Sequence, residues 1–138
     1  MKRAELAVRS CAEAALTPFR LTPTQFLLLY RLQESPGISS AELARSIGVR
    51  PQSIVDLIGP LEREELIKRR EAREHRRILR ITLTAAGKRL LGQALPIARQ
   101  LEEKLLSTLN AQEAALLHGG LTKLLANAQA HDPRASIV

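Results

Sequence analysis

Basic side chains gather in one short stretch of the sequence. Between residues 68 and 80, seven basic residues stand against two acidic ones, a local net charge of +5 in a chain whose total is +7. Guanidinium groups bind phosphates and guanine edges through paired N–H donors. The stretch therefore predicts the binding of an anionic partner. Its basic residues are Lys68, Arg69, Arg70, Arg73, Arg76, Arg77 and Arg80.

A second group of polar residues, suited to hydrogen bonding with base edges, precedes the basic stretch. Glutamine can pair with adenine, serine with several bases, and arginine with guanine or phosphate. A carboxylate can accept from a cytosine amino group or pair with a nearby arginine. Ser39 and Ser40 would offer hydroxyl and backbone N–H groups to a phosphate, and Ser39 can equally serve as a helix cap. The candidates for base contact are Arg50, Gln52, Ser53 and Asp56.

Two short helices in helix-turn-helix spacing would position these residues. Ser39 and Glu42 have the spacing of a capping box, and Gly48 can take the left-handed conformation that ends a helix. Pro51 suits the first position of the next helix. We expect that helix to break near Gly59-Pro60, so that only its first two turns are straight. Its predicted apolar face consists of Ile54, Val55, Leu57, Ile58 and Leu61.

After Leu66 the apolar period changes from that of a helix to that of a strand. Leu79, Ile81 and Leu83 alternate with polar neighbours, and residues 66–70 can pair with them antiparallel. The basic residues would then decorate a hairpin, where charge can also serve only to block edge-to-edge pairing. Helix, turn, helix and hairpin in this order are the plan of a winged helix-turn-helix, which favours duplex DNA as the partner.

The flanking segments are predicted to be helices that need a partner. Helices are expected over about 3–16, from Pro23 to the Ser35-Pro36-Gly37 stop, from Thr84 to about Leu109, and from Asn110 to about Gln129. Bends are expected at Pro96 and at Gly119-Gly120. The last two helices carry leucines at three and four spacing, typical of a dimerisation region. The alternative is that they cover the core of the monomer.

The composition excludes several other classes of protein. The chain has 138 residues, a sequence pI of about 10.5, 45% hydrophobic and only 2% aromatic residues. So few aromatic rings cannot form a stacking platform for single-stranded nucleic acid. The sequence has no apolar run long enough for a membrane span or signal peptide, which predicts a cytoplasmic protein. It shows no constellation for catalysis, for a metal or for a cofactor, and its single cysteine excludes a disulfide framework.

The chain resembles the MarR family of bacterial transcriptional regulators. The resemblance is carried by LTPTQFLLLYRL, SSAELARSIGVRPQSIVDLIGPLE, LIKRR and RRILRITLTAAG, within about residues 21–90. It implies a mainly α fold with a small β-hairpin wing: one domain over 1–138, a DNA-binding lobe over about 21–90, and dimerisation helices over about 1–20 and 91–138. It also implies a homodimeric repressor whose recognition helices enter major grooves and whose wings reach minor grooves of a pseudo-palindromic operator. Release by a small aromatic acid or by oxidation is implied as well.

Several positions depart from the family pattern. The wing usually carries Asp-x-Arg, and here His75 stands at the Asp and Arg77 at the Arg; a shift of one would give Glu74 and Arg76. Arg77 is the first choice for the minor groove, with Arg73 and Arg76 as phosphate or groove contacts. Arg50 replaces the usual hydroxyl cap of the recognition helix. Glu65 stands where a helix-ending Gly is usual.

The regulatory signal has two sequence-based alternatives. Some family members sense peroxide through a cysteine near the N-terminus, supported by tyrosines, but the only tyrosine here is Tyr30. We therefore expect Cys11 to be inert and partly buried, and His118 and His131 to be surface residues. A small aromatic acid is the favoured effector, and a basic pocket near the base of the wing would suit it. A peroxide sensor using Cys11, and a winged helix that binds RNA or protein, are the other interpretations.

Overall fold

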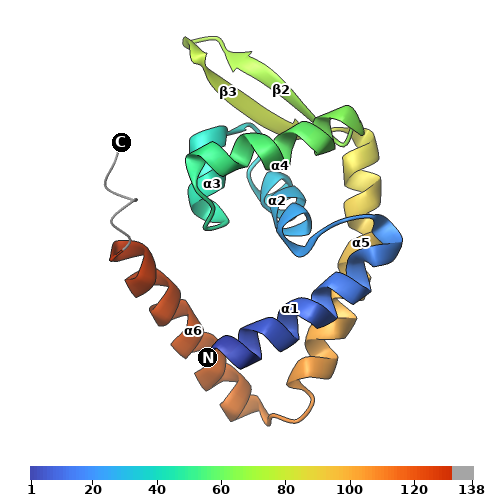
Figure 1. Ribbon diagram of the computed structural model, residues 1–138, viewed down its shortest axis with the longest axis vertical. Helices are drawn as coiled ribbons and strands as arrows, with labels where there is room; N and C mark the ends of the chain where they lie inside the picture. The colour runs from blue at the N-terminus through green and yellow to red at the C-terminus, as the bar shows by residue number, and fades with distance from the viewer. Residues whose placement is uncertain (132–138) are drawn as a thin grey trace. The chain divides into compact units, whose positions relative to one another are not determined.

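The computed structural model describes residues 1–131, except for the side chains of His75 and Arg76. Within this range the chain is mainly helical with one small antiparallel sheet, as the sequence predicts (Figure 1). The elements are α1 (Lys2–Leu16), the 3-10 turn η1 (Thr17–Phe19), α2 (Pro23–Glu34), β1 (Ile38–Ser39), α3 (Ser40–Ser46), α4 (Pro51–Arg63), β2 (Ile67–Ala72), β3 (His75–Leu83), α5 (Ala85–Leu106) and α6 (Ala111–Ala130).

Two compact units divide the chain. The first is Met1–Leu101, and the second begins at Glu102, inside α5. The first unit holds the helix-turn-helix, the sheet and the whole buried core. The functional division at about residues 20 and 90, into a DNA-binding lobe and dimerisation helices, stays a prediction.

The helix starts follow the local signals in the sequence. Three capping boxes are formed, by Thr22 with Gln25, Ser39 with Glu42, and Asn110 with Glu113. Each satisfies two backbone N–H groups that the first helical turn leaves without partners. These contacts confirm the predicted starts of α2, α3 and α6.

Leucine and isoleucine build the core, as the low aromatic content requires. Side chains from α2, α3, α4, β3 and α5 pack together in the first unit. Burying each of them contributes about 1.5–3 kcal/mol of hydrophobic free energy. The most deeply buried large side chains are Leu28, Leu29, Leu32, Leu43, Leu61, Ile67, Ile81 and Leu91.

The sheet has three strands in the order β1-β3-β2. The pairing of β2 with β3 confirms the predicted hairpin, and Ile67 lies opposite Leu83 at its base. Near the tip the register shifts, because Glu71 pairs with Leu79 but Ala72 pairs with His75. The short strand β1, which pairs with β3, was not predicted. The β2–β3 ribbon extends beyond α4 and forms the wing (Figure 1).

The predicted break at Gly59-Pro60 is wrong, because α4 continues through Pro60 to Arg63. Proline at this position removes one donor to the carbonyl of Asp56, a residue on the exposed face where water can replace the bond. Ile58 and Leu61, on either side of Gly59-Pro60, are both buried and hold the helix against the core. Packing therefore outweighs the loss of one hydrogen bond.

The recognition helix ends in a Schellman motif built around Glu65. The N–H of Leu66 donates to the Leu61 carbonyl at 2.9 Å, and the N–H of Glu65 donates to the Glu62 carbonyl at 3.0 Å. Glu65 has φ +59°, a left-handed conformation that favours glycine. The Thr84 hydroxyl donates to the Glu65 carbonyl at 2.5 Å, which ties this turn to the start of α5.

Candidate nucleic-acid interface

The exposed face of α4 carries the predicted base-contact residues. Gln52 and Asp56 are exposed and Ser53 is partly exposed, whereas Ile54 and Ile58 are buried on the opposite face. Since residues three and four apart share a helix face, Gln52 and Asp56 lie side by side. This arrangement presents an amide and a carboxylate together on one surface.

Val55 corrects the sequence analysis. It was predicted on the apolar face of α4, but its side chain is 60% exposed and lies on the same face as Gln52 and Gly59. The 3.6-residue period through Ile54, Ile58 and Leu61 already places Val55 about 100° away from the core, so a stricter reading of the period would have found it. An exposed apolar group on this face can contact a thymine methyl group.

The residues at the helix starts behave in two different ways. Arg50 is the N-cap of α4, is exposed, and makes no capping bond through its side chain. Ser39 is a true cap, because its Oγ accepts from the Glu42 N–H at 3.2 Å and donates to Glu42 Oε2 at 2.8 Å. Ser40 is partly exposed. Arg50 is thus available to a ligand, while the Ser39 hydroxyl already has two partners.

Hydrogen bonds from Ser39 lower the pKa of the Glu42 carboxyl below its usual value. Because the pKa of this carboxyl is lower in the folded protein than in the unfolded one, the contact stabilises the fold at pH values above the ordinary pKa of glutamate. The contribution is lost as the pH falls through the folded value. The cap at the start of α3 is therefore weakest in acid.

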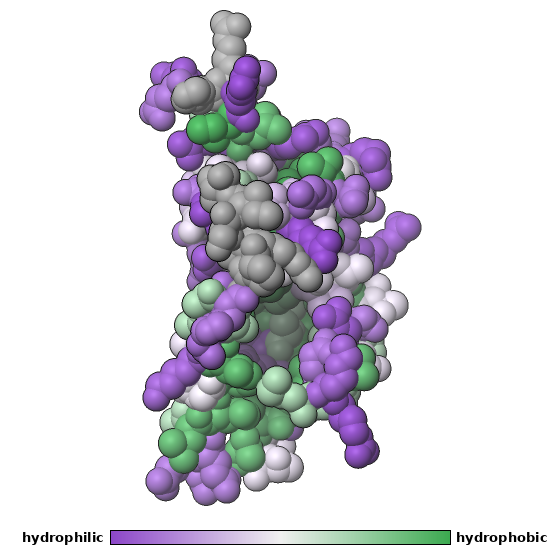
Figure 2. Space-filling model, turned by 60° about the vertical axis from the view of Figure 1, so that its left-hand side comes forward, coloured by the Kyte–Doolittle hydropathy of each residue, from purple (hydrophilic) through white to green (hydrophobic). Residues whose placement is uncertain are grey.

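The tip of the wing presents arginines in an irregular segment of β3. Arg73 lies in the turn between the strands and is exposed, and Arg77 lies on β3 and is exposed. The register shift beside Glu71 leaves residues 76–78 without regular partners on β2, and such irregularities re-aim side chains. The side chain of Arg76 lies outside the described part of the chain. Figure 2 shows hydrophilic side chains, coloured purple, on both sides of the upper end of the view, with hydrophobic ones, coloured green, between them.

One arginine of the basic stretch is bound within the protein. Arg69 of β2 contacts the Glu62 carboxylate of α4 twice, through Nη2 at 2.5 Å and Nε at 3.0 Å. Hydrogen bonding to Glu62 raises the pKa of the Arg69 guanidinium. Arg69 was predicted to belong with the other basic residues of the stretch. It lies two positions from Ile67, so both side chains are on the face of β2 that is turned toward α4. This ion pair links the recognition helix to the wing.

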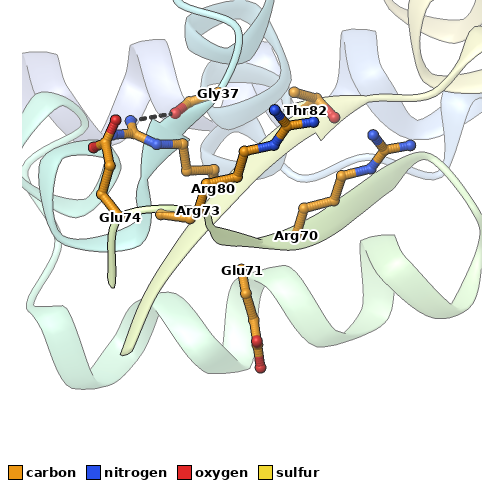
Figure 3. A pocket seen from close by; sticks show the side chains of 8 residues that line it. Gly37, Arg70, Glu71, Arg73, Glu74, Arg80 and Thr82 are labelled. Atoms are coloured by element: carbon orange, nitrogen blue, oxygen red, sulfur yellow. Dashed lines mark hydrogen bonds between the residues drawn. The ribbon is translucent and has the colours of Figure 1, made fainter. Parts of the chain in front are cut away.

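Two cavities adjoin the wing. One, of about 350 Å³, lies on the wing and is lined by Arg70, Arg73, Arg80 and Glu74 among others (Figure 3). The other, of about 420 Å³, lies at the wing base and is lined by Glu62, Glu65 and Lys68 together with Ile67, Thr84, Ala85 and Ala86. The wing-base cavity is therefore not the basic pocket that the sequence analysis expected there.

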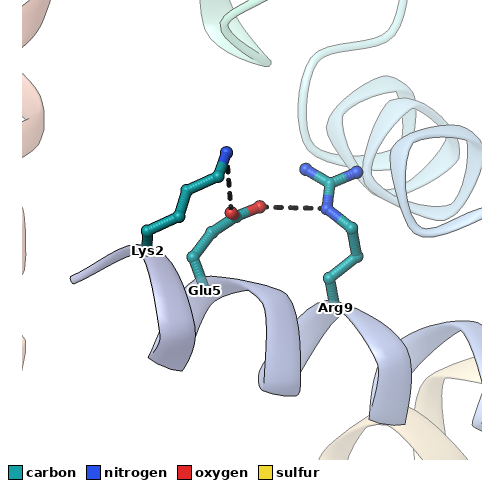
Figure 4. A network of polar contacts seen from close by, with 3 residues as sticks. All are labelled: Lys2, Glu5 and Arg9. Carbon is teal, nitrogen blue, oxygen red and sulfur yellow. Dashed lines mark hydrogen bonds and ion pairs between the residues drawn. The ribbon is translucent and has the colours of Figure 1, made fainter.

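Cys11 is exposed, which corrects the expectation that it is partly buried. The helical segment around it is almost entirely on the surface, because α1 buries only Leu16 in the described chain. The nearby cation Arg9 donates from Nε to Glu5 at 3.0 Å, and Lys2 lies 3.7 Å from the same carboxylate (Figure 4). Arg9 is thus paired with a carboxylate on its own helix. His118 and His131 are exposed, as predicted.

The terminal helices expose many apolar side chains. No residue of α6 is buried, and α1 contributes two further exposed apolar groups. Figure 2 shows hydrophobic side chains, coloured green, on the surface of the chain. Exposed apolar side chains in such number on one helix, as on α6, are typical of a protein interface. The exposed residues on these helices are Leu6, Val8, Leu116, Leu117, Leu121, Leu124 and Leu125.

The fold and the site define a winged helix-turn-helix protein. The family model described as "MarR family" matches residues 21–79. The chain is 35% identical over 122 residues to the HTH-type transcriptional repressor Rv2887 of Mycobacterium tuberculosis, with 88% of each chain covered. The protein therefore belongs to the MarR family, whose members are transcriptional regulators and not enzymes.

Solved structures agree with this assignment. The transcriptional repressor CouR, bound to a 23-mer DNA duplex, superimposes with a TM-score of 0.84 at 29% identity, covering 89% of this chain and 87% of that one. The regulator MOSR of Mycobacterium tuberculosis, in complex with DNA, gives a TM-score of 0.83 at 26% identity, covering 94% and 92%. In the described part of this chain, no helix is long and apolar enough to cross a membrane.

Proposed function

We propose that the protein is a homodimeric repressor that binds a pseudo-palindromic sequence in duplex DNA. The observation that carries the proposal is the exposed polar face of α4, set in a helix-turn-helix and flanked by a basic wing. The repressor named in Mycobacterium tuberculosis and the DNA-bound repressor CouR support it. Because its target would be the chromosome of a bacterium, we infer a cytoplasmic location.

The α4 helix would enter the major groove. Gln52, Ser53 and Asp56 are proposed to contact base edges, with Arg50 on guanine or a phosphate. We now add Val55 as a contact for a thymine methyl group. Ser39 and Ser40 would approach a backbone phosphate, with backbone N–H groups as the main donors because the Ser39 hydroxyl is engaged by Glu42.

The wing would reach the neighbouring minor groove. Arg77 is proposed as the residue inserted there, and Arg73 and Arg76 as contacts to flanking phosphates or the groove. The exposure of Arg73 and Arg77 supports these roles. In a symmetric dimer two such lobes would read half-sites about one helical turn apart.

The test begins with the selection of bound duplexes from a random pool, followed by affinity measurements on the selected operator and on a random duplex. Gln52→Ala should weaken operator binding by about 1–3 kcal/mol and leave random DNA almost unchanged, because base contacts carry discrimination. Arg77→Ala should weaken binding to both duplexes and reduce the salt dependence of the affinity. The reason is that this residue mainly neutralises the negative potential of the DNA backbone and groove.

Lys123→Gln removes an exposed charge from α6, outside the proposed interface, and serves as the control. Equal affinity of the wild type for operator and random DNA at physiological salt would remove the repressor function. Preferential binding to structured RNA in a competition experiment would favour the RNA-binding alternative. If the operator preference survives unchanged in Gln52→Ala, the reading residues are wrongly placed although the function stands.

A small aromatic carboxylate is the proposed effector, and a peroxide signal through Cys11 is the alternative. The exposed position of Cys11 favours the peroxide signal, because an oxidant can reach the thiol. The pairing of Arg9 with Glu5 argues against it, because Arg9 has a carboxylate partner.

Gel-shift titrations with hydroperoxide and with salicylate-type acids separate the two signals. We expect release of operator DNA by the acid, and no difference between wild type and Cys11→Ser when peroxide is added. An acid that lowers operator affinity tenfold must favour the dimer that does not bind DNA by about 1.4 kcal/mol. Peroxide release that disappears in Cys11→Ser would establish the cysteine sensor instead.

A further inference from the structure

The wing carries two arginines directly opposite each other on neighbouring strands. Arg70 of β2 is paired with Arg80 of β3 in the antiparallel register, and both side chains are exposed. Like charges facing each other across a ladder destabilise a sheet. An anion held between them would remove that repulsion, so this pair suits a bound state better than the free protein.

The surroundings of the pair leave the positive charge in excess. Arg70 and Arg80 line the cavity of about 350 Å³ together with Arg73, whereas Glu71 points to the other side of the hairpin (Figure 3). Of the two carboxylates that line the cavity, Glu71 and Glu74, only Glu74 lies on the side of the three arginines, and the Glu42 carboxylate also interacts electrostatically with Arg80. Among the described residues, no ion pair within 4.0 Å involves Arg70, Arg73 or Arg80.

Arg80 is also held in place before any ligand binds. Its Nη1 donates to the carbonyl oxygen of Gly37 at 3.0 Å (Figure 3). A guanidinium has five N–H donors, so this bond fixes the group and leaves other donors for an anion. The Thr82 hydroxyl lies two positions along β3, and it too lines the cavity.

We propose that Arg70 and Arg80, assisted by Arg73, form a phosphate site on the wing that takes a backbone phosphate of bound DNA. The planar guanidinium fork matches phosphate oxygens with two parallel hydrogen bonds. We assign the phosphate to DNA because the site lies on the hairpin whose tip is proposed to reach the minor groove. The inference rests on the proposed function and extends the DNA contact beyond the residues named there.

The test compares wild type with the double variant Arg70→Gln/Arg80→Gln, which keeps polar side chains at both positions. Affinity for the selected operator and for a random duplex is measured over a range of salt concentrations. We expect affinity for both duplexes to fall about tenfold at low salt, and the logarithmic salt slope to decrease by about 1 for one lost phosphate contact. The ratio of operator to random affinity should not change, because phosphates carry no sequence information.

Thermal unfolding of the free protein supplies a readout that distinguishes a DNA contact from a merely structural role. Removal of the cross-strand repulsion should offset the lost hydrogen bond from Arg80 to Gly37, so the melting temperature should stay close to that of the wild type. Arg89→Gln/Arg99→Gln removes the same charge from exposed positions on α5 and should retain the wild-type salt slope. A lower melting temperature together with weaker DNA binding in Arg70→Gln/Arg80→Gln would show a structural role and overturn the proposal.

Duplexes carrying one neutral methylphosphonate in place of a phosphate locate the contact. One position should weaken binding of the wild type and have no effect on Arg70→Gln/Arg80→Gln. If Arg70→Gln/Arg80→Gln has the same salt slope as the wild type and keeps the operator preference, the phosphate site is overturned and the proposed function stands. If the wild type itself shows no preference for the operator, the proposed function is overturned. Binding of inorganic phosphate by the free wild type but not by the variant, with unchanged DNA slopes, would assign the site to a free phosphate and overturn the DNA contact.

Discussion

At the scale of single residues, Glu65, in the turn after α4, has a strained backbone conformation. Glu65 holds φ +59° within the Schellman motif, and a side chain with a Cβ atom is strained there. Glu65→Gly should therefore stabilise the protein by about 0.5–1 kcal/mol, after allowance for the greater freedom of glycine in the unfolded chain. The hydrogen bond from the Thr84 hydroxyl to the backbone carbonyl of residue 65 can form in the variant as well. Chemical denaturation measures the change.

The neighbouring residue provides a matched control for this prediction. Glu64 has the same side chain but φ −82°, an ordinary conformation. Glu64→Gly should destabilise the protein by about 0.5–1 kcal/mol, because only the unfolded-state effect remains. If both glycine variants lost stability, the left-handed strain assigned to Glu65 would be refuted.

At the scale of elements, the ion pair between Glu62 and Arg69 fixes the wing relative to the recognition helix. It joins α4 to β2 through two contacts, although each side chain is about one third exposed. A double-mutant cycle with Glu62→Gln and Arg69→Gln should give a coupling of about 0.5 kcal/mol in stability. Each single variant should also weaken operator binding, because α4 and the wing would no longer reach their grooves in a fixed relation.

The pair Arg31 and Glu34 on α2 is a suitable comparison, because it is a close ion pair of similar exposure that lies within one helix and joins no two elements. Arg31→Gln/Glu34→Gln should leave operator affinity as in the wild type. Unchanged DNA affinity in both single variants of the Glu62 and Arg69 pair would restrict that pair to stability alone.

At the scale of the whole molecule, the exposed leucines of α6 predict an obligate dimer. Leu121 is 54% and Leu125 is 59% exposed. A charged side chain at each position would face the partner helix across a desolvated interface. Leu121→Glu/Leu125→Glu should shift sedimentation at micromolar concentration from dimer to monomer, and operator affinity should fall because one lobe cannot read two half-sites.

Gln129→Glu adds one charge to the last turn of the same helix and should remain dimeric, because it removes no apolar surface. A monomeric wild type at micromolar concentration would contradict the proposed dimer. It would also contradict the proposal that the protein binds a two-fold symmetric operator. A dimeric Leu121→Glu/Leu125→Glu variant would instead show that α6 lies outside the interface.

Most of the scaffold follows from signals that act within a few residues. The capping boxes at Thr22, Ser39 and Asn110 and the left-handed Gly48 set helix boundaries through local hydrogen bonds. The period-two apolar pattern of β3 defines the buried face of the wing. These features, and with them the winged helix-turn-helix order, could be predicted because their causes lie three or four positions apart in the chain.

Tertiary structure alone decided which side chains within this scaffold are free to bind. The strand register places Arg70 opposite Arg80 and directs Arg69 toward Glu62. Arginines of the same basic stretch therefore have different partners. Packing of Ile58 and Leu61 carries α4 through Pro60, and the weak anchoring of α1 leaves Cys11 exposed. The physical reason is that the partners and the exposure of a side chain depend on contacts between segments that are distant in sequence. The composition of a short stretch does not determine those contacts.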